Sequence, residues 1–210
     1  MKNLKFTLLA IVLLTATSAS AQFSFGVRGG VNMSNIQTDV QDVITSPKFG
    51  FTIGAFADFD FSPDMAIQSG LFFSTKGSRE NVTVAVSHPD GYFTRTDRIV
   101  TNFLYLQLPV HFAYRIDVSP GTRVVFHGGP YVAYAVGGSV RVNGERDRNA
   151  FGCRVVQYQP FDWGLGIGVG GEFERILVGI GWDFGLFDIS NQSNVRSRNQ
   201  NAFLTVGYRF

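Results

Sequence analysis

The sequence predicts an all-β fold: an eight-stranded antiparallel up-and-down β-barrel that crosses a membrane and follows a cleaved signal peptide. Three observations lead to this prediction. Short segments alternate between apolar residues and polar or glycine residues, short and long connections alternate between these segments, and no apolar run after the leader is long enough for a membrane helix. Because successive strand side chains point to opposite faces, each segment has one apolar and one polar face.

The N-terminus has the features of a secretory signal peptide. Lys2 and Lys5 precede an apolar run from Phe6 to Leu14, and Ala19-Ser20-Ala21 offers small residues at a cleavage site. A single membrane helix would need about 20 apolar residues, more than this run supplies. We therefore expect a signal peptide at residues 1–21 and one mature domain at residues 22–210.

The mature chain is electrically balanced. The full sequence has 18 basic and 16 acidic residues, and residues 1–21 contain two lysines and no acids, which leaves 16 of each. Binding to nucleic acid depends on an excess of positive charge, so no nucleic-acid partner is expected. Cys153 is the only cysteine, which excludes an intramolecular disulfide and suggests an incidental loop thiol.

Four segments with alternating faces occupy the first half of the mature chain. In the second of them the odd-numbered positions from Phe49 to Phe61 are apolar, whereas Asp58 and Asp60 fall on the opposite face. Pro109 stands inside the fourth segment and predicts a bulge or a strand end there, because proline cannot donate to a ladder. The four expected strands are residues 23–33, 49–61, 65–76 and 103–115.

Four further strands are expected in the second half. The clearest has large apolar residues on one face and glycines with Asp162 and Glu172 on the other. A glycine face leaves room in a narrow interior, so this strand favours a barrel whose outside meets lipid. Gly128-Gly129-Pro130 predicts a local bend. The expected strands are residues 123–140, 161–173, 176–186 and 204–210.

The connections then predict the orientation. Links after the second, fourth and sixth strands are short, whereas the four others are long: residues 34–48, 77–102, 141–160 and 188–202. Outer-membrane barrels have short periplasmic turns and longer extracellular loops, which places both termini on the short-turn side. The second long connection contains alternating valines around His88-Pro89-Asp90-Gly91, so we expect a hairpin that continues above the membrane.

Charged residues on the polar faces form a balanced set. Charges that faced hydrocarbon would cost several kcal/mol each, so in a membrane barrel they must point inward and pair. The alternative is a soluble barrel of the lipocalin type, in which the apolar face lines a cavity and the charges meet solvent. The predicted interior network consists of Arg28, Lys76, Arg115, Arg123 and Arg209 with Asp58, Asp60, Asp162, Glu172 and Asp183.

Several segments resemble the outer-membrane β-barrel domain family of Bacteroidota, a porin-like family. The resemblance is carried by residues 25–32, 50–77 with the ending Ser74-Thr75-Lys76-Gly77, 105–110, 129–132 and 207–210, and it spans the mature chain. It implies an outer-membrane barrel in contact with lipid but no common activity, and some members look like secretion-accessory barrels. The terminal pair Tyr208 and Phe210 resembles the signal read by the outer-membrane assembly machinery, although Thr205 stands where that signal often has glycine.

The expected function is non-catalytic. An eight-stranded barrel has an interior that side chains fill, so the main hypothesis is a structural, surface-interaction or secretion and assembly component that acts through its four long loops. The alternative is a narrow porin-like channel for ions or small solutes. A lipid-acting enzyme would need a nucleophile and a base, but the spacing of His111, His127, Ser69 and Ser74 forms no hydrolase motif. The three histidines lack the close spacing of metal ligands, and the glycines belong to strand patterns instead of a phosphate loop, so no cofactor is expected. The loops are rich in arginine: Arg95, Arg98, Arg146, Arg148, Arg196 and Arg198.

Overall fold

The computed structural model describes residues 22–39, 43–88, 91–147, 151, 158–191 and 196–210. Within these residues the secondary structure is β, and no helix there is long and apolar enough to cross a membrane. The predicted signal peptide and Cys153 lie outside the described residues. The strands are β1 (Phe23–Thr38), β2 (Val43–Ser62), β3 (Met65–Lys76), β4 (Ser78–His88), β5 (Gly91–Ser119), β6 (Thr122–Val142), β7 (Glu145–Asp147), β8 (Phe161–Phe173), β9 (Ile176–Gly185) and β10 (Ser197–Arg209).

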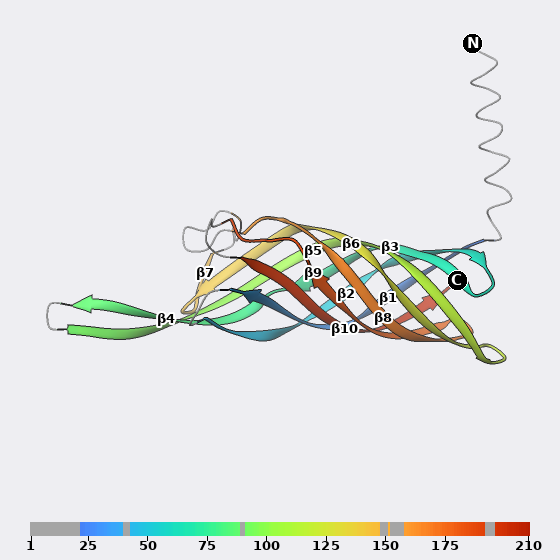
Figure 1. Cartoon of the computed structure of the whole chain (residues 1–210), viewed down its shortest axis with the longest axis horizontal. Helices are drawn as coiled ribbons and strands as arrows, with labels where there is room; N and C mark the ends of the chain where they lie inside the picture. Colours follow the sequence, from blue (N-terminus) through green and yellow to red (C-terminus); the bar gives the residue numbers. More distant parts are fainter. Residues whose placement is uncertain (1–21, 40–42, 89–90, 148–150, 152–157, 192–195) are drawn as a thin grey trace, which may run out of the picture.

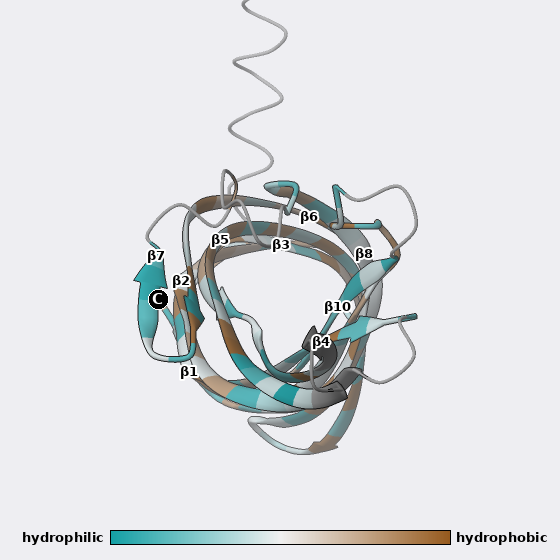
Figure 2. Ribbon diagram, turned by 90° about the vertical axis from the view of Figure 1, so that its left-hand side faces the viewer, coloured by the Kyte–Doolittle hydropathy of each residue, from teal (hydrophilic) through white to brown (hydrophobic). Residues whose placement is uncertain are grey.

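Antiparallel pairing joins eight of these strands into a closed ring. Going round it, β1 pairs with β2, followed by β3, β5, β6, β8, β9 and β10, and β10 pairs again with β1. Figure 2 shows these strands encircling a common axis. The two remaining strands extend the sheet at one end: β4 pairs with β2 and β5, and β7 pairs with β6. The all-β antiparallel prediction is confirmed.

Side chains follow the period of two that the sequence shows. Large apolar residues such as Ile53, Ile167 and Ile180 are more than half exposed on the outer surface, whereas Asp58 and Asp162 are fully buried inside the ring. This distribution is the reverse of a soluble lipocalin-type barrel, in which apolar side chains would face inward. The structure therefore contradicts the soluble alternative.

Short turns and long extensions lie at opposite ends of the molecule. The β2–β3, β5–β6 and β8–β9 turns and the C-terminus share one end, while β4 and the first part of β5 project from the other (Figure 1). β4 and β5 form the expected hairpin, with pairs running from Arg79↔Val100 to His88↔Gly91. The strands extend well beyond the predicted apolar segments, because ladder hydrogen bonds continue where the side chains have become polar.

The predicted bulge or strand end at Pro109 is wrong. β5 passes through this residue, and its register with β6 is the same at Pro109↔Tyr131 as at Phe112↔Gly128. Proline removes one donor but keeps its carbonyl, which accepts a hydrogen bond from Ser69 Oγ at 2.8 Å. The register shift in the upper part of this pairing lies between Leu104 and Tyr105.

Glycine allows neighbouring strands to approach closely at selected positions. A Cβ added at Gly164 on β8 would lie 2.0 Å from the Phe184 carbonyl oxygen, whereas a Cβ at Gly137 on β6 would have nothing within 4 Å. Backbone atoms cannot move aside as a flexible side chain can. The β8–β9 contact therefore depends on the missing side chain at Gly164.

This contrast gives a matched pair of variants. Gly164→Ala should lower the free energy of unfolding by about 1–3 kcal/mol, because the added methyl group overpacks a backbone contact. Gly137→Ala is the control and should change it by less than about 0.5 kcal/mol. Urea titration of the refolded protein in detergent micelles, followed by tryptophan fluorescence, measures both values. Equal stability of the two variants would contradict the close-approach explanation.

Candidate functional site

The polar interior of the ring is the candidate site, because it gathers titratable side chains from strands that are far apart in sequence. The ten residues predicted to form one network occupy different levels. Six lie in a cluster near the short turns, called here the lower cluster: Asp58, Asp60, Arg115, Arg123, Glu172 and Arg209. Three lie in an upper cluster, Lys76, Asp162 and Asp183, and Arg28 joins neither through an ion pair in the described residues.

Arg115 on β5 is the centre of the lower cluster. Its buried guanidinium donates from Nη2 to Asp58 Oδ2 at 3.2 Å and from Nε to Glu172 Oε1 at 3.3 Å. A third hydrogen bond runs from Nη1 to Asp60. One arginine thus neutralises carboxylates from β2 and β8, neither of which is its neighbour in the ring.

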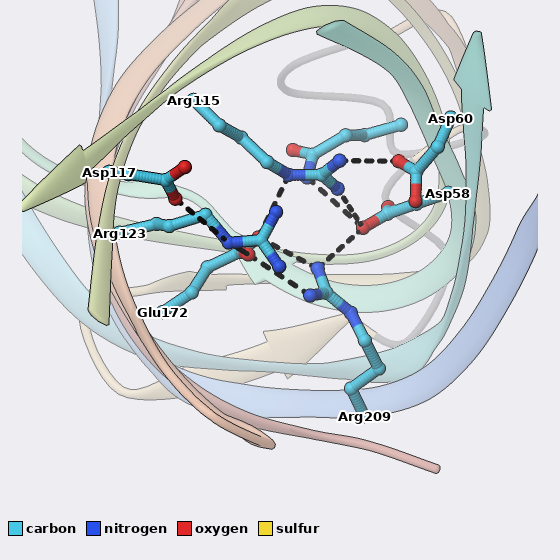
Figure 3. A network of polar contacts seen from close by, with 8 residues as sticks. Asp58, Asp60, Arg115, Asp117, Arg123, Glu172 and Arg209 are labelled. Carbon is cyan, nitrogen blue, oxygen red and sulfur yellow. Dashed lines mark hydrogen bonds and ion pairs between the residues drawn. The ribbon is translucent and has the colours of Figure 1, made fainter. Parts of the chain in front are cut away.

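Arg209, the last residue of β10, binds the same two strands. It donates to both oxygens of Glu172, at 2.7 and 3.0 Å, and to Asp58 Oδ2 at 2.9 Å (Figure 3). Two parallel hydrogen bonds between arginine and a carboxylate are stronger and more directional than a single bond. Arg123 completes the cluster at the mouth, 3.7 Å from Glu172 and 3.7 Å from Asp117, an exposed partner that the sequence analysis did not include.

Lys76 is the only cation of the upper cluster among the described residues, and it is fully buried. Its Nζ lies 4.0 Å from Asp162 Oδ2 and 3.8 Å from Asp183 Oδ2. The ammonium also lies over the ring of Tyr131, 4.6 Å from the centroid, and 5.5 Å from that of Tyr105. Aromatic faces attract a desolvated cation, so the two tyrosines and the two carboxylates together stabilise the Lys76 ammonium in its buried position.

Neutral polar side chains outside the predicted charge network complete the upper cluster. Asn199 Nδ2 donates to Asp162 Oδ2 at 3.0 Å, while Gln107 and Asn201 donate to Asp183 Oδ2 at 3.1 and 3.2 Å. Asn199 and Asn201 fall in a segment predicted to be a loop. The signal that could have found them is their alternation in step with Thr205, which continues the inward face of β10 upward.

Between the clusters lies a small cavity of about 70 Å³, lined in part by Arg28, His111 and His127. The two imidazoles stack with centroids 5.2 Å apart, and their Nδ1 atoms are 3.0 Å apart, so one ring donates to the other. Arg28 lies over Phe56, 5.0 Å from the ring centroid. Buried oxygens and nitrogens around the cavity lack a protein partner, as expected where a few water molecules complete the hydrogen bonding.

An apolar cluster, called here the apolar cap, lies at the end of the ring that carries the long extensions. Phe103 contacts the rings of Tyr105, Phe151 and Tyr158 at centroid distances between 5.1 and 5.7 Å. Ile189 and other buried residues from the extensions join the same cluster. Tyr105 therefore belongs both to this apolar cap and to the cage around Lys76.

The arrangement is that of a stabilised interior. Ser69 donates to a backbone carbonyl and Ser74 accepts from Asn32 Nδ2 at 3.1 Å, so neither serine is hydrogen-bonded to a histidine in the contacts that the structure describes. Across the described ranges, no group of three or more His, Cys, Asp or Glu residues could hold a metal ion. These side chains neutralise one another's charges, connect strands across the ring and occupy its interior.

Comparisons with known proteins give a family model and a set of solved structures. A family model described as "Outer membrane protein beta-barrel domain" matches residues 16–191. No curated protein matches the chain by sequence. Among solved structures, OprG of Pseudomonas aeruginosa is 15% identical, covers 90% of this chain and 96% of its own, and has a TM-score of 0.47.

Two further solved structures are similar at the same level. Ail, the attachment invasion locus protein of Yersinia pestis, is 14% identical with a TM-score of 0.42, over 90% of this chain and 99% of that one. Neisserial surface protein A is 14% identical with a TM-score of 0.44, over 89% and 97% of the two chains.

Removing the central arginine should destabilise the protein strongly. Arg115→Met should lower the free energy of unfolding by about 3–5 kcal/mol, because it leaves the buried carboxylates of the lower cluster one positive charge short. Arg95→Met, which removes an exposed arginine paired with Asp97, should change it little. Urea unfolding of the refolded proteins measures the difference.

A second substitution tests whether charge is the cause. Adding Asp58→Asn to Arg115→Met removes one buried carboxylate, which restores the charge balance of the lower cluster, and should recover part of the lost stability. A double variant less stable than Arg115→Met would show that packing, not charge, explains the effect.

Proposed function

Because this chain belongs to the outer membrane protein β-barrel domain family and is an outer-membrane protein, we propose that it is a non-catalytic, eight-stranded transmembrane barrel with a side-chain-filled interior. In this proposal it acts as a structural, surface-interaction or secretion and assembly component. The observation that carries the proposal is the filling of the interior at successive levels by the lower cluster, the upper cluster and the apolar cap.

Two bands of exposed aromatic side chains mark the proposed membrane span. One lies near the short turns and includes Phe25, Tyr114, Phe126 and Tyr208, while the other includes Phe49, Tyr134 and Trp163. Aromatic girdles of this kind flank the apolar band of outer-membrane barrels. The outward residues between the bands, such as Ile53 and Ile167, would then face hydrocarbon.

The proposed orientation places the short turns in the periplasm and the long extensions outside the cell. Residues 1–21 would be a signal peptide removed on export, and residues 22–210 would form the mature barrel. Tyr208 and Phe210 are exposed at the short-turn end, with their rings 6.1 Å apart, where the outer-membrane assembly machinery could bind them. The Phe210 N–H donates to the Phe25 carbonyl at 2.9 Å, so this signal also lies where the ring closes.

A narrow porin-like channel is the alternative, and the filled interior argues against it. A permeating ion would have to displace Arg115 from its carboxylates and Lys76 from its cage, and then pass the apolar cap. Each step separates buried charges or hydrates apolar surface. We therefore assign the function to the outer surface and the extracellular segments instead of to transport.

The direct test is conductance of the mature barrel in a planar lipid bilayer. The expected result is a folded protein, shown by heat-modifiable gel mobility, that produces no open steps. Reproducible open steps would favour the channel instead. Failure to insert into lipid would reject the proposed transmembrane barrel itself.

The lipid-facing surface gives a second test. Ile167→Arg places a charge in the middle of the proposed span and should destabilise the protein by about 2–4 kcal/mol in lipid vesicles. Val118→Arg, an exposed position beside the β5–β6 turn, should cost at most about 1 kcal/mol because it lies at the edge of the span. Urea unfolding in vesicles compares the two, and equal costs would contradict the proposed position of the bilayer.

A further inference from the structure

Three arginines share one row on the outward face of the extended sheet. Arg79 on β4 pairs with Val100 on β5, Val100 pairs with Arg141 on β6, and Arg141 pairs with Arg146 on β7. Residues that pair across antiparallel strands lie on the same face. All three arginines are exposed, so the row faces away from the interior, at the end where β4 and β7 lie in Figure 1.

The described part of the chain offers the charge of this row no ion-pair partner. None of the ion pairs found in the described part of the chain involves Arg79, Arg141 or Arg146. Glu145 and Asp147 pair with Val142 and Val140, which places them on the opposite face of β7. Like charges directly opposite each other destabilise a sheet, and Arg141↔Arg146 is such a pair. An anion bound between them would remove this cost.

Lys48 and an apolar surface adjoin the row. Lys48 on β2 lies close enough to Arg79 for the two charges to interact. It borders an outward groove of about 490 Å³ whose lining also includes Phe49, Phe51, Leu104 and Arg146. Phe49 is 76% exposed and belongs to the upper aromatic band. The cations therefore stand directly beyond a surface suited to acyl chains.

We propose that Arg79, Arg141 and Arg146, together with Lys48, bind the phosphate groups of an outer-leaflet lipid whose acyl chains pack against Phe49 and Phe51. This inference rests on the proposed function, because it needs the long extensions to lie outside the cell. A soluble polyanion could reach cations at the tips of the extensions, but it has no use for a groove that continues into the apolar belt. Arginine binds phosphate through paired N–H donors, and basic pockets beside membrane spans bind lipid headgroups.

The test is a titration of lipid A carrying two phosphates into the refolded mature protein in neutral detergent, with bound lipid counted by native mass spectrometry. The triple variant Arg79→Gln, Arg141→Gln, Arg146→Gln should bind about 100-fold more weakly, since each basic residue near an anionic lipid surface contributes roughly a fivefold factor. The matched control Arg95→Gln, Arg196→Gln, Arg198→Gln removes the same charge elsewhere and should bind as the unmodified protein does.

Further arms identify the source of the phosphate. Dephosphorylated lipid A should bind equally weakly to the unmodified protein and to the triple variant. Inorganic phosphate at millimolar concentration should not displace the intact lipid from the unmodified protein. Equal lipid binding by the triple variant and the control, or full displacement by inorganic phosphate, would overturn the inference. Heat-modifiable mobility and silent conductance report on the proposed function separately: a folded, silent barrel without lipid preference rejects this inference alone, whereas failure to insert rejects both.

Discussion

The structure depends on one constraint, which is that backbone polar groups inside a bilayer must find their partners within the protein. An open sheet would leave unpaired N–H and C=O groups along each edge, and the pairing of β1 with both β2 and β10 removes those edges. Once the ring is closed, the strand period of two sends alternate side chains to lipid and to the interior. The exposed Ile167 and the buried Asp162 on the same strand are consequences of this closure.

Closure also decides what the interior has to contain. Eight strands enclose a space that side chains fill, and charges that cannot face lipid are stable there only when they are paired. Arg115 and Arg209 both bind carboxylates from β2 and β8, although neither β5 nor β10 is adjacent to those strands. The ion pairs that neutralise the interior therefore also connect strands that are not adjacent in the ring. The same ion pairs both fill the interior and stabilise the ring.

Alternation in the sequence was enough to predict the antiparallel β fold, the short turns and the inward position of residues such as Asp58 and Glu172, because these depend on a local period. It could not predict that the charges would separate into two clusters, because that depends on the height of each strand in the ring. Asn199 was missed for a related reason: apolar patterning marks only the part of each strand that meets lipid, and Asn199 lies beyond the predicted strand 204–210. The prediction at Pro109 was wrong because the loss of one backbone N–H donor does not by itself interrupt a strand. The β5–β6 pairs on either side of Pro109 keep the same register.

The register shift between Leu104 and Tyr105 decides which residues of β6 face outward. On the short-turn side of the shift, the even-numbered residues of β6, such as Tyr134, face outward. On the other side the odd-numbered residues do, so Arg141 faces outward and lies in the same row as Arg79. The two ends of the ring consequently present arginine in different ways. Arg115 and Arg209 are held by carboxylates inside the short-turn end, whereas Arg79 and Arg141 stand outside the other end without an ion-pair partner among the described residues. Paired cations inside the ring neutralise its carboxylates, whereas in our proposal the cations at its outer rim bind anionic groups of the surrounding leaflet.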